Sequence, residues 1–280
     1  MKIIEGYKLL HRNNYTEYQN NLNVRVIDVQ GIKIGGNTPV IIAGPCAVQS
    51  YEQTIEIAKA VKKAGANLLR GGAFKPRTSP YEFQGLGKEG LEILRQAKNI
   101  TGLPIVTEVL DPRLVDMVYE YADIFQIGSR NMYNIPLLKE VARTQKPVIL
   151  KRSMSAGLQE WLCLAEYIAL EGNLDIILCE RGIRTFPCKE YSRNTLDLNI
   201  LLPLREKTFL PIIVDPSHAT GDAKIVPFAS LASIQFNING LLIEVIKEDD
   251  NVEDILCDAV QGIKPSDLDK IVKKINYLYK

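Results

Sequence analysis

The sequence lacks the features that define several protein classes. Its 280 residues contain no apolar run near the ~20 residues of a membrane span, and residues 1–10 have charges throughout instead of the apolar core of a signal peptide. Lys and Arg (34) nearly balance Asp and Glu (33), so there is no basic field for nucleic acid or an acidic membrane surface. The five cysteines are an odd number, which favours free thiols. We therefore expect a cytoplasmic protein that binds neither nucleic acid nor membrane.

The chain also lacks an internal boundary, since no Gly/Ser linker, low-complexity tract or charge run divides it. A single α/β barrel needs about 250 residues, which this length allows. Two β-rich runs, 24–29 and 32–34, flank Gln30-Gly31 and predict a hairpin. We predict an N-terminal extension with this hairpin over 1–38 and a catalytic domain over 39–280.

From residue 39 onward, short apolar segments alternate with amphipathic ones. The predicted strands are 40–43, 67–70, 105–107, 124–127, 148–150, 175–178, 212–214 and 241–244. The predicted helices are 53–64, 88–99, 112–121, 135–143, 158–169, 195–204, 222–233 and 266–278. Alternation of this kind favours a parallel sheet, and strands that are apolar on both faces agree with it. Eight such units predict an α/β fold, a (β/α)8 TIM barrel.

The segment after the second predicted strand, 69–80, has an unusual composition for a loop. It places Arg70, Lys75 and Arg77 among two glycines, two prolines and the hydroxyl groups of Thr78 and Ser79. Glycines allow a ligand to approach the backbone, and prolines fix the shape of the loop. Cations with hydroxyl groups suit phosphate or carboxylate. A solvated basic loop is the alternative, but such a loop needs no rigid frame, so we predict an anion-binding loop.

The active site of a barrel enzyme lies at the C-terminal ends of its strands, and here every predicted strand leads to a charged or metal-binding side chain. One group is cationic: Arg70, Lys75, Arg130, Lys151 and Arg181, with Arg184 as a further candidate. Crowded cations are unfavourable without an anion. We therefore expect a multiply charged small substrate, such as a phosphorylated carboxylic acid. Alternatively, Lys151 and Arg152 are the solvated end of their strand.

A second group at the strand ends combines a thiol, an imidazole and two carboxyl groups. Its members are Cys46, His218, Glu244 and Asp258. This donor set suits a transition metal such as zinc, iron or manganese. Cys46 could instead be a small buried apolar residue, and Asp258 a helix carboxylate. The other histidine, His11, lies in the polar N-terminal segment and is assigned no role. The remaining cysteines have no metal-type spacing, and we interpret them as packing or neighbouring residues: Cys163, Cys179, Cys188 and Cys257.

Seven motifs together resemble those of a known enzyme family. They lie at 42–46, 69–80, 83–87, 126–131, 150–152, 178–186 and 214–221, within a resemblance that spans about 24–261. The chain resembles the 3-deoxy-D-arabino-heptulosonate 7-phosphate (DAHP) synthases of type Iβ. The Lys-Pro-Arg-Thr-Ser sequence in 69–80 is similar to that branch, whereas the KDO8P-synthase-like branch has an Ala-Asn-Arg-Ser type of sequence there. The resemblance implies a transferase that condenses phosphoenolpyruvate with erythrose 4-phosphate, giving DAHP and phosphate. This is the first step of the shikimate pathway to the aromatic amino acids.

The resemblance also implies roles for individual residues. Phosphoenolpyruvate would be held by Arg70, Lys75, Arg130, Lys151 and Arg181, with Arg184 counted among the substrate-binding residues. The aldose phosphate would be held by Arg77 and Thr78. One divalent metal (manganese, iron, zinc or cobalt) would be bound by Cys46, His218, Glu244 and Asp258, and would act as a Lewis acid on the aldehyde. Lys75 is a candidate proton donor whose pKa we expect crowding by Arg70 to lower. Asp215 and Glu108 are candidates for orienting the aldose or a water. A homotetramer, or a homodimer, is expected from the family.

The chain departs from the family pattern at three places. Asp222 and Ala223 stand where two arginines are common, Ile246 stands where a histidine commonly follows the metal glutamate, and 235–240 differs from the usual sequence. These departures leave open a different acceptor, such as arabinose 5-phosphate or an amino sugar. A non-catalytic barrel that senses a phosphorylated metabolite is a third hypothesis. Loss of a metal ligand would favour that hypothesis, and all four candidates are present.

Overall fold

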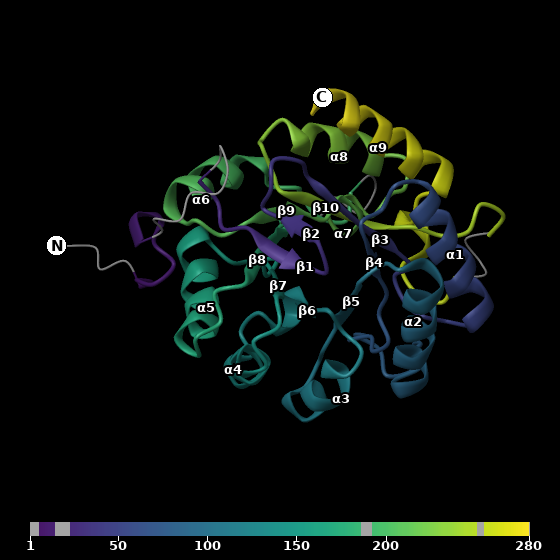
Figure 1. Ribbon diagram of the computed structural model, residues 1–280, viewed down its shortest axis with the longest axis horizontal. Coiled ribbons are helices and arrows are strands. Elements are labelled where there is room, and N and C mark those ends of the chain that lie inside the picture. Colours follow the sequence, from purple (N-terminus) through teal and green to yellow (C-terminus); the bar gives the residue numbers. More distant parts are fainter. Residues whose placement is uncertain (1–5, 15–22, 186–191, 251–254, 280) are drawn as a thin grey trace.

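The computed structural model describes residues 6–14, 23–185, 192–250 and 255–279. Within these ranges, eight parallel strands close into a barrel in the order β10-β3-β4-β5-β6-β7-β8-β9 (Figure 1). The barrel strands are β3 Val40–Gly44, β4 Leu68–Arg70, β5 Ile105–Glu108, β6 Ile124–Ile127, β7 Val148–Lys151, β8 Ile176–Glu180, β9 Ile212–Val214 and β10 Gly240–Glu244. Every residue of these strands is buried, as expected for strands that have neighbours on both faces. The predicted TIM barrel is confirmed.

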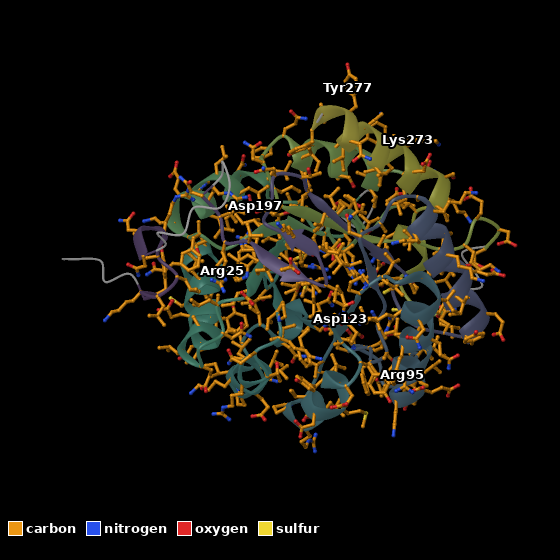
Figure 2. The ribbon with its side chains drawn as sticks, viewed as in Figure 1. Arg25, Arg95, Asp123, Asp197, Lys273 and Tyr277 are labelled. Carbon is orange, nitrogen blue, oxygen red and sulfur yellow. The ribbon has the colours of Figure 1, made fainter. Side chains whose placement is uncertain are left out.

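Helices surround the barrel. They are α1 Tyr51–Lys63, α2 Lys88–Thr101, α3 Val115–Tyr119, α4 Ile135–Arg143, α5 Leu158–Leu170, α6 Leu201–Lys207, α7 Pro216–Thr220, α8 Val226–Ile234 and α9 Pro265–Leu278. Figure 2 shows the side chains of Arg95 on α2 and of Lys273 and Tyr277 on α9 at the outer surface. None of the helices in the described part of the chain has both the length and the apolar character that crossing a bilayer requires.

Three predicted helices differ from the structure by more than two residues at one end or at both. The helix predicted at 112–121 is a 3-10 turn followed by α3, because Asp111 caps the turn through the backbone N–H of Arg113 and proline occupies its first position. The helix predicted at 195–204 begins later, because Thr195 pairs with Ile183 through two backbone hydrogen bonds. The helix predicted at 222–233 begins later, as α8, and a short helix that was not predicted, α7, precedes it. Gly221, with φ of +69°, ends α7 in the left-handed conformation.

The predicted hairpin is confirmed as β1 Ile27–Val29 paired antiparallel with β2 Ile32–Ile34. Its turn has positive φ at Gln30 (53°) and Gly31 (87°), the conformation of a two-residue hairpin loop. Figure 1 shows the hairpin across the centre of the ring of strands. Its apolar side chains form one cluster with inward-facing residues of the barrel: Val40, Ile42, Leu68, Val106, Ile124, Ile149, Ile177, Ile213 and Leu242. The division of the chain at residue 38 stays a prediction.

Apart from Glu166 on α5, the buried charged side chains of the described residues gather at the opposite, C-terminal ends of the barrel strands. Those on the strands or within a few residues of their ends are Arg70, Lys75, Glu108, Lys151, Arg152, Glu180, Arg181, Asp215 and Glu244. Because a buried charge is expensive without a partner, such a gathering indicates a site built for charged ligands. The barrel interior thus has a packed apolar core at the hairpin end and a charged site at the opposite end.

Candidate active site

A cavity of about 290 Å³ opens among the loops that follow the barrel strands. Eight cationic residues line it: Arg70, Lys75, Arg77, Arg130, Lys151, Arg181, Arg184 and Arg193. Thr78, Glu108, His218 and Asp258 also face it. The structure therefore brings together all the predicted substrate-binding residues, and it adds Arg193.

Two of the cavity's arginines have buried nitrogen atoms without hydrogen-bond partners in the described structure. They are Nε and Nη1 of Arg70 and Nη1 of Arg181. A buried donor left unpaired costs about 1–3 kcal/mol, and more when it is charged. Phosphate or carboxylate oxygens would satisfy these donors with charge-assisted hydrogen bonds. The cavity is consequently suited to a small anion.

The loop that follows β4 is held against the segment around Cys46. Lys75 donates from Nζ to the carbonyl of Cys46 (3.2 Å) and lies 3.1 Å from its Sγ. Glycine is needed at position 72, since a Cβ there would lie 2.8 Å from the Cys46 carbonyl oxygen. Arg70 and Lys75 are both buried. For these two residues, the alternative of a solvated basic loop is wrong.

The environment of Lys75 differs from the one expected. Burial by itself would lower the pKa of this ammonium group, but the acidic groups of Cys46, Cys257, Glu108 and Glu244 raise the pKa well above its usual value. The expectation of a pKa lowered by Arg70 is therefore wrong, because the acidic neighbours outweigh that single cation. The raised pKa favours the charged form of Lys75.

The four predicted metal ligands meet beside the cavity, although they come from distant parts of the chain. One ligand atom from each of Cys46, His218, Glu244 and Asp258 lies within 4.8 Å of all the others. Nε2 of His218 is 3.2 Å from Glu244 Oε1 and 3.8 Å from Asp258 Oδ2. Asp258 has a φ of 53°, a left-handed conformation that is rare outside glycine and often marks functional positions.

These residues fit a transition-metal ion by their chemistry. Sulfur, imidazole nitrogen and carboxylate oxygen are the donors of zinc, iron and manganese sites. Glu244 Oε1 is buried and accepts no hydrogen bond from any described residue, although Nη2 of Arg70 lies 3.1 Å away. A metal ion would satisfy this oxygen. Burial lowers the pKa of His218 to about 4, against the opposing effect of Asp215, so the ring is neutral and able to ligate at pH 7.

Asp215 orients His218 in two ways. As the cap of α7, it accepts the backbone N–H of His218 at Oδ1 (2.9 Å), and its Oδ2 lies 2.7 Å from Nδ1 of the same residue. Lys151 donates to Oδ2 as well (2.5 Å). Burial would raise the pKa of Asp215, but the hydrogen bond with His218 and the charge of Lys151 hold it well below the usual value. The charged carboxylate fixes the proton on Nδ1 and leaves Nε2 free for a ligand bond. Asp215 is not among the described residues that line the cavity, so this geometry orients the imidazole rather than an aldose.

Lys151 and Arg152 are both buried, so the alternative of a solvated strand end is wrong. Arg152 forms ion pairs with Glu180 (3.0 Å) and Asp197 (2.8 Å) and does not line the cavity. Glu108 does line it, and glycine at position 128 makes room for the carboxylate, since a Cβ there would lie 2.0 Å from Glu108 Oε1.

Comparison with known proteins identifies the family. The sequence profile of the DAHP synthetase I family matches residues 18–279. The chain belongs to this family. It is 44% identical over 263 residues to the phospho-2-dehydro-3-deoxyheptonate aldolase of Thermotoga maritima, across 94% of this chain and 75% of that protein. The crystal structure of the DAHP synthase from that organism superposes with a TM-score of 0.90 and 42% identity, over 99% of this chain and 78% of the other. The family prediction is confirmed.

Relatives named for an octonate are less similar to this chain. The 2-dehydro-3-deoxyphosphooctonate aldolase of Geobacter metallireducens is 30% identical over 270 residues, across 90% of this chain and 96% of that protein. A truncated DAHP synthase from Thermotoga maritima superposes with a TM-score of 0.85 and 39% identity, over 98% of this chain and 96% of the other. Similarity is thus greater to the heptonate branch of the family.

Sequence reasoning did not assign three residues of the site. Cys257 lies with its Sγ 3.4 Å from Cys46 Sγ, and Arg77 donates to it (2.7 Å). Arg193 contacts the carboxyl group of Asp258, and Gln261 contacts that of Glu244, both of them candidate metal ligands. Their signals were weak: Cys257 adjoins Asp258, and Arg193 shares a loop with Arg181. Cys188, which was predicted to be a packing or neighbouring residue, lies outside the described residues.

Proposed function

We propose that this protein is a DAHP synthase, which condenses phosphoenolpyruvate with erythrose 4-phosphate to give DAHP and phosphate. The observation that supports this most directly is the meeting of an anion-binding cavity with a sulfur, nitrogen and oxygen donor cluster at one end of a family barrel. A phosphorylated carboxylic acid needs the cations, and an aldehyde acceptor needs an electrophilic activator beside them.

Phosphoenolpyruvate binds in the cationic part of the cavity. The unpaired donors of Arg70 and Arg181 bind its oxygens, and Lys75, Lys151 and Arg130 add positive charge around it. Such preorganised cations stabilise the charge that moves onto phosphate as it leaves. The raised pKa of Lys75 supports a role as hydrogen-bond donor and cation.

One divalent metal (manganese, iron, zinc or cobalt) would be held by Cys46, His218, Glu244 and Asp258. When bound, it supplies Lewis-acid polarisation of the acceptor's aldehyde. C3 of phosphoenolpyruvate forms a bond to the aldehyde carbon, and the aldehyde oxygen takes up a proton. A water adds at C2 and gives up one proton. The bond from C2 to the phosphate oxygen then breaks while the C2 hydroxyl loses its remaining proton, so that a ketone forms at C2 and phosphate leaves with that proton. Glu108 lines the cavity and can accept a hydrogen bond from this water or from the aldose.

The acceptor is a four-carbon aldose phosphate, held at the Arg77 and Thr78 end of the cavity. Arabinose 5-phosphate is the second candidate, since relatives named for the octonate product match the chain at 30% identity or below. The 44% identity to a heptonate enzyme favours erythrose 4-phosphate. The test is product formation from phosphoenolpyruvate with each aldose in parallel. A higher kcat/KM with arabinose 5-phosphate would overturn the acceptor assignment.

Two further properties belong to the same proposal. The protein forms a homotetramer, which multi-angle light scattering would test, with a homodimer as the other expected state. It works in the cytoplasm, where a reducing environment keeps the thiol groups of Cys46 and Cys257 available. Localisation of a tagged chain would test this compartment.

A further inference from the structure

In each of the two carboxyl groups of the candidate metal site, one oxygen faces the other ligands and the second contacts a residue outside the ligand group. Asp258 directs Oδ2 toward Cys46 and His218 (3.6 and 3.8 Å), while its Oδ1 lies 3.1 Å from Nη1 of Arg193. Glu244 directs Oε1 toward His218 (3.2 Å), while its Oε2 accepts a hydrogen bond from Nε2 of Gln261 (2.5 Å). Each carboxylate thus has one oxygen inside the ligand group and one held from outside.

A single arginine joins the two outer contacts. Nη1 of Arg193 also donates to Oε1 of Gln261 (3.0 Å). Because a guanidinium group can only donate, it requires the amide oxygen of Gln261 on its own side. The amide nitrogen is thereby turned toward Glu244, and the side chain of Gln261 is buried. The orientation that Gln261 offers to Glu244 is consequently set by Arg193.

The backbone around Arg193 is fixed on two sides, so the guanidinium has a defined origin. Arg193 donates its N–H to Thr220 and Asn194 donates to Ala219, both in α7, while the neighbouring Thr195 pairs with Ile183 after β8. Gly221 leaves the necessary space, since a Cβ there would lie 2.6 Å from Cβ of Arg193. The segment therefore connects the loop after β8 to the helix that contains His218.

We propose that Arg193 and Gln261 are positioning residues that hold Asp258 and Glu244 in the orientation that binds metal. Arg193 acts on Asp258 directly and on Glu244 through Gln261. This inference rests on the metal site of the proposed function. Groups that orient metal ligands from outside change metal affinity by about 10–100-fold when they are removed.

The direction in which metal affinity changes when Arg193 is replaced distinguishes a positioning role from a purely electrostatic one. Removing a cation beside a metal site strengthens the attraction for a metal cation. If Arg193 acted only as a charge, Arg193→Met would bind metal more tightly. If it positions carboxylates, the same variant binds metal more weakly. Gln261→Met changes no charge, so its effect reports positioning alone. Arg184→Met is the matched control, because Arg184 lines the same cavity and no described contact joins its side chain to a ligand carboxylate.

The experiment is titration of metal-free protein with Co²⁺, followed by calorimetry and by the visible absorption of the bound ion. We expect Arg193→Met and Gln261→Met each to weaken Co²⁺ binding by about 10–100-fold and to alter the absorption spectrum. Arg184→Met should bind as tightly as the wild type, or more tightly. The double variant should lose less than the product of the single losses, because the two residues act in series on Glu244.

Further measurements separate the possible failures. Arg193→Lys, which keeps one donor, should retain an intermediate affinity, and it replaces Arg193→Met if that variant does not fold. A merely structural role would lower the melting temperature of the metal-free variants but leave affinity and spectrum unchanged. Unchanged or tighter binding by Arg193→Met and Gln261→Met would overturn the inference while leaving the metal site intact. A wild-type chain that binds Co²⁺ equally well after Cys46→Ser and His218→Ala would instead overturn the proposed site itself.

Discussion

Asp215 offers a sharp test of how the barrel supports its chemistry, because it has two partners of different kinds. It forms a buried ion pair with Lys151 and holds Nδ1 of His218. The substitution Asp215→Asn keeps the shape of the side chain but removes its charge. It leaves a buried Lys151 without a counter-ion and removes the charged partner that fixes the imidazole proton.

The size of both effects follows from burial. The side chains of Lys151 and Asp215 are 5% and 0% exposed, and breaking such a buried pair costs about 3–5 kcal/mol of unfolding free energy. For a chain of this size, that loss lowers the melting temperature by about 6–20 °C. Loss of the group that orients a ligating histidine weakens metal binding by about 10–100-fold. The assays are thermal unfolding of the metal-free protein and Co²⁺ titration.

The matched control is Glu180→Gln. Glu180 is also fully buried and pairs with Arg152, but none of its described side-chain contacts is with a candidate metal ligand. It should lower the melting temperature by a similar amount and leave metal affinity unchanged. If Asp215→Asn lost stability to the same extent and kept wild-type metal affinity, Asp215 would be a charge partner of Lys151 only, and the orienting role would be refuted.

Three other predictions concern the cavity and the metal. Gly128→Ala places a Cβ 2.0 Å from Glu108 Oε1, so we expect that carboxylate to move. The value of kcat/KM should then fall about 100-fold, while circular dichroism shows an intact fold. An unchanged rate would mean that Glu108 has no role in the mechanism. Arg181→Met removes a buried donor that has no described partner. A hydrogen bond from this charged group to phosphoenolpyruvate contributes about 1.5–3 kcal/mol, so the KM for phosphoenolpyruvate should rise about 10–150-fold. An unaltered KM would contradict this role of Arg181. Free metal at 100 times its dissociation constant stabilises the protein by about 2.7 kcal/mol, so chelation should lower the melting temperature by about 5–11 °C. A melting temperature that does not change when the chelator is added would contradict the four-ligand site.

The barrel was predictable because each of its strands is a short apolar run, which can be identified from the local sequence alone. Val40–Gly44 and Ile176–Glu180 are buried on both faces, and such runs differ plainly from the amphipathic helices between them. Helix ends were less predictable, because they depend on single contacts. The cap by Asp111 and the pairing of Thr195 with Ile183 are not visible in an apolar periodicity.

Much of the site was also predictable, for a topological reason. In a parallel barrel, residues at strand ends share one rim, so Cys46, Lys151 and Glu244 could be brought together from their positions alone. The positions of Cys257, Arg193 and Gln261 could not be predicted in this way, because they lie in loops or, for Gln261, in a 3-10 turn, whose paths follow no periodic pattern. The pKa of Lys75 was predicted in the wrong direction because it depends on through-space neighbours such as Cys257, which no spacing reveals.

The most direct test of the central claim is the rate at which metal-reconstituted protein consumes phosphoenolpyruvate with erythrose 4-phosphate, before and after chelation. We predict turnover with stoichiometric release of phosphate, abolished by the chelator and restored by added divalent metal. Turnover that survives complete removal of metal would contradict the four-ligand site. Absence of turnover in the metal-loaded protein, with phosphoenolpyruvate bound, would contradict the assigned acceptor.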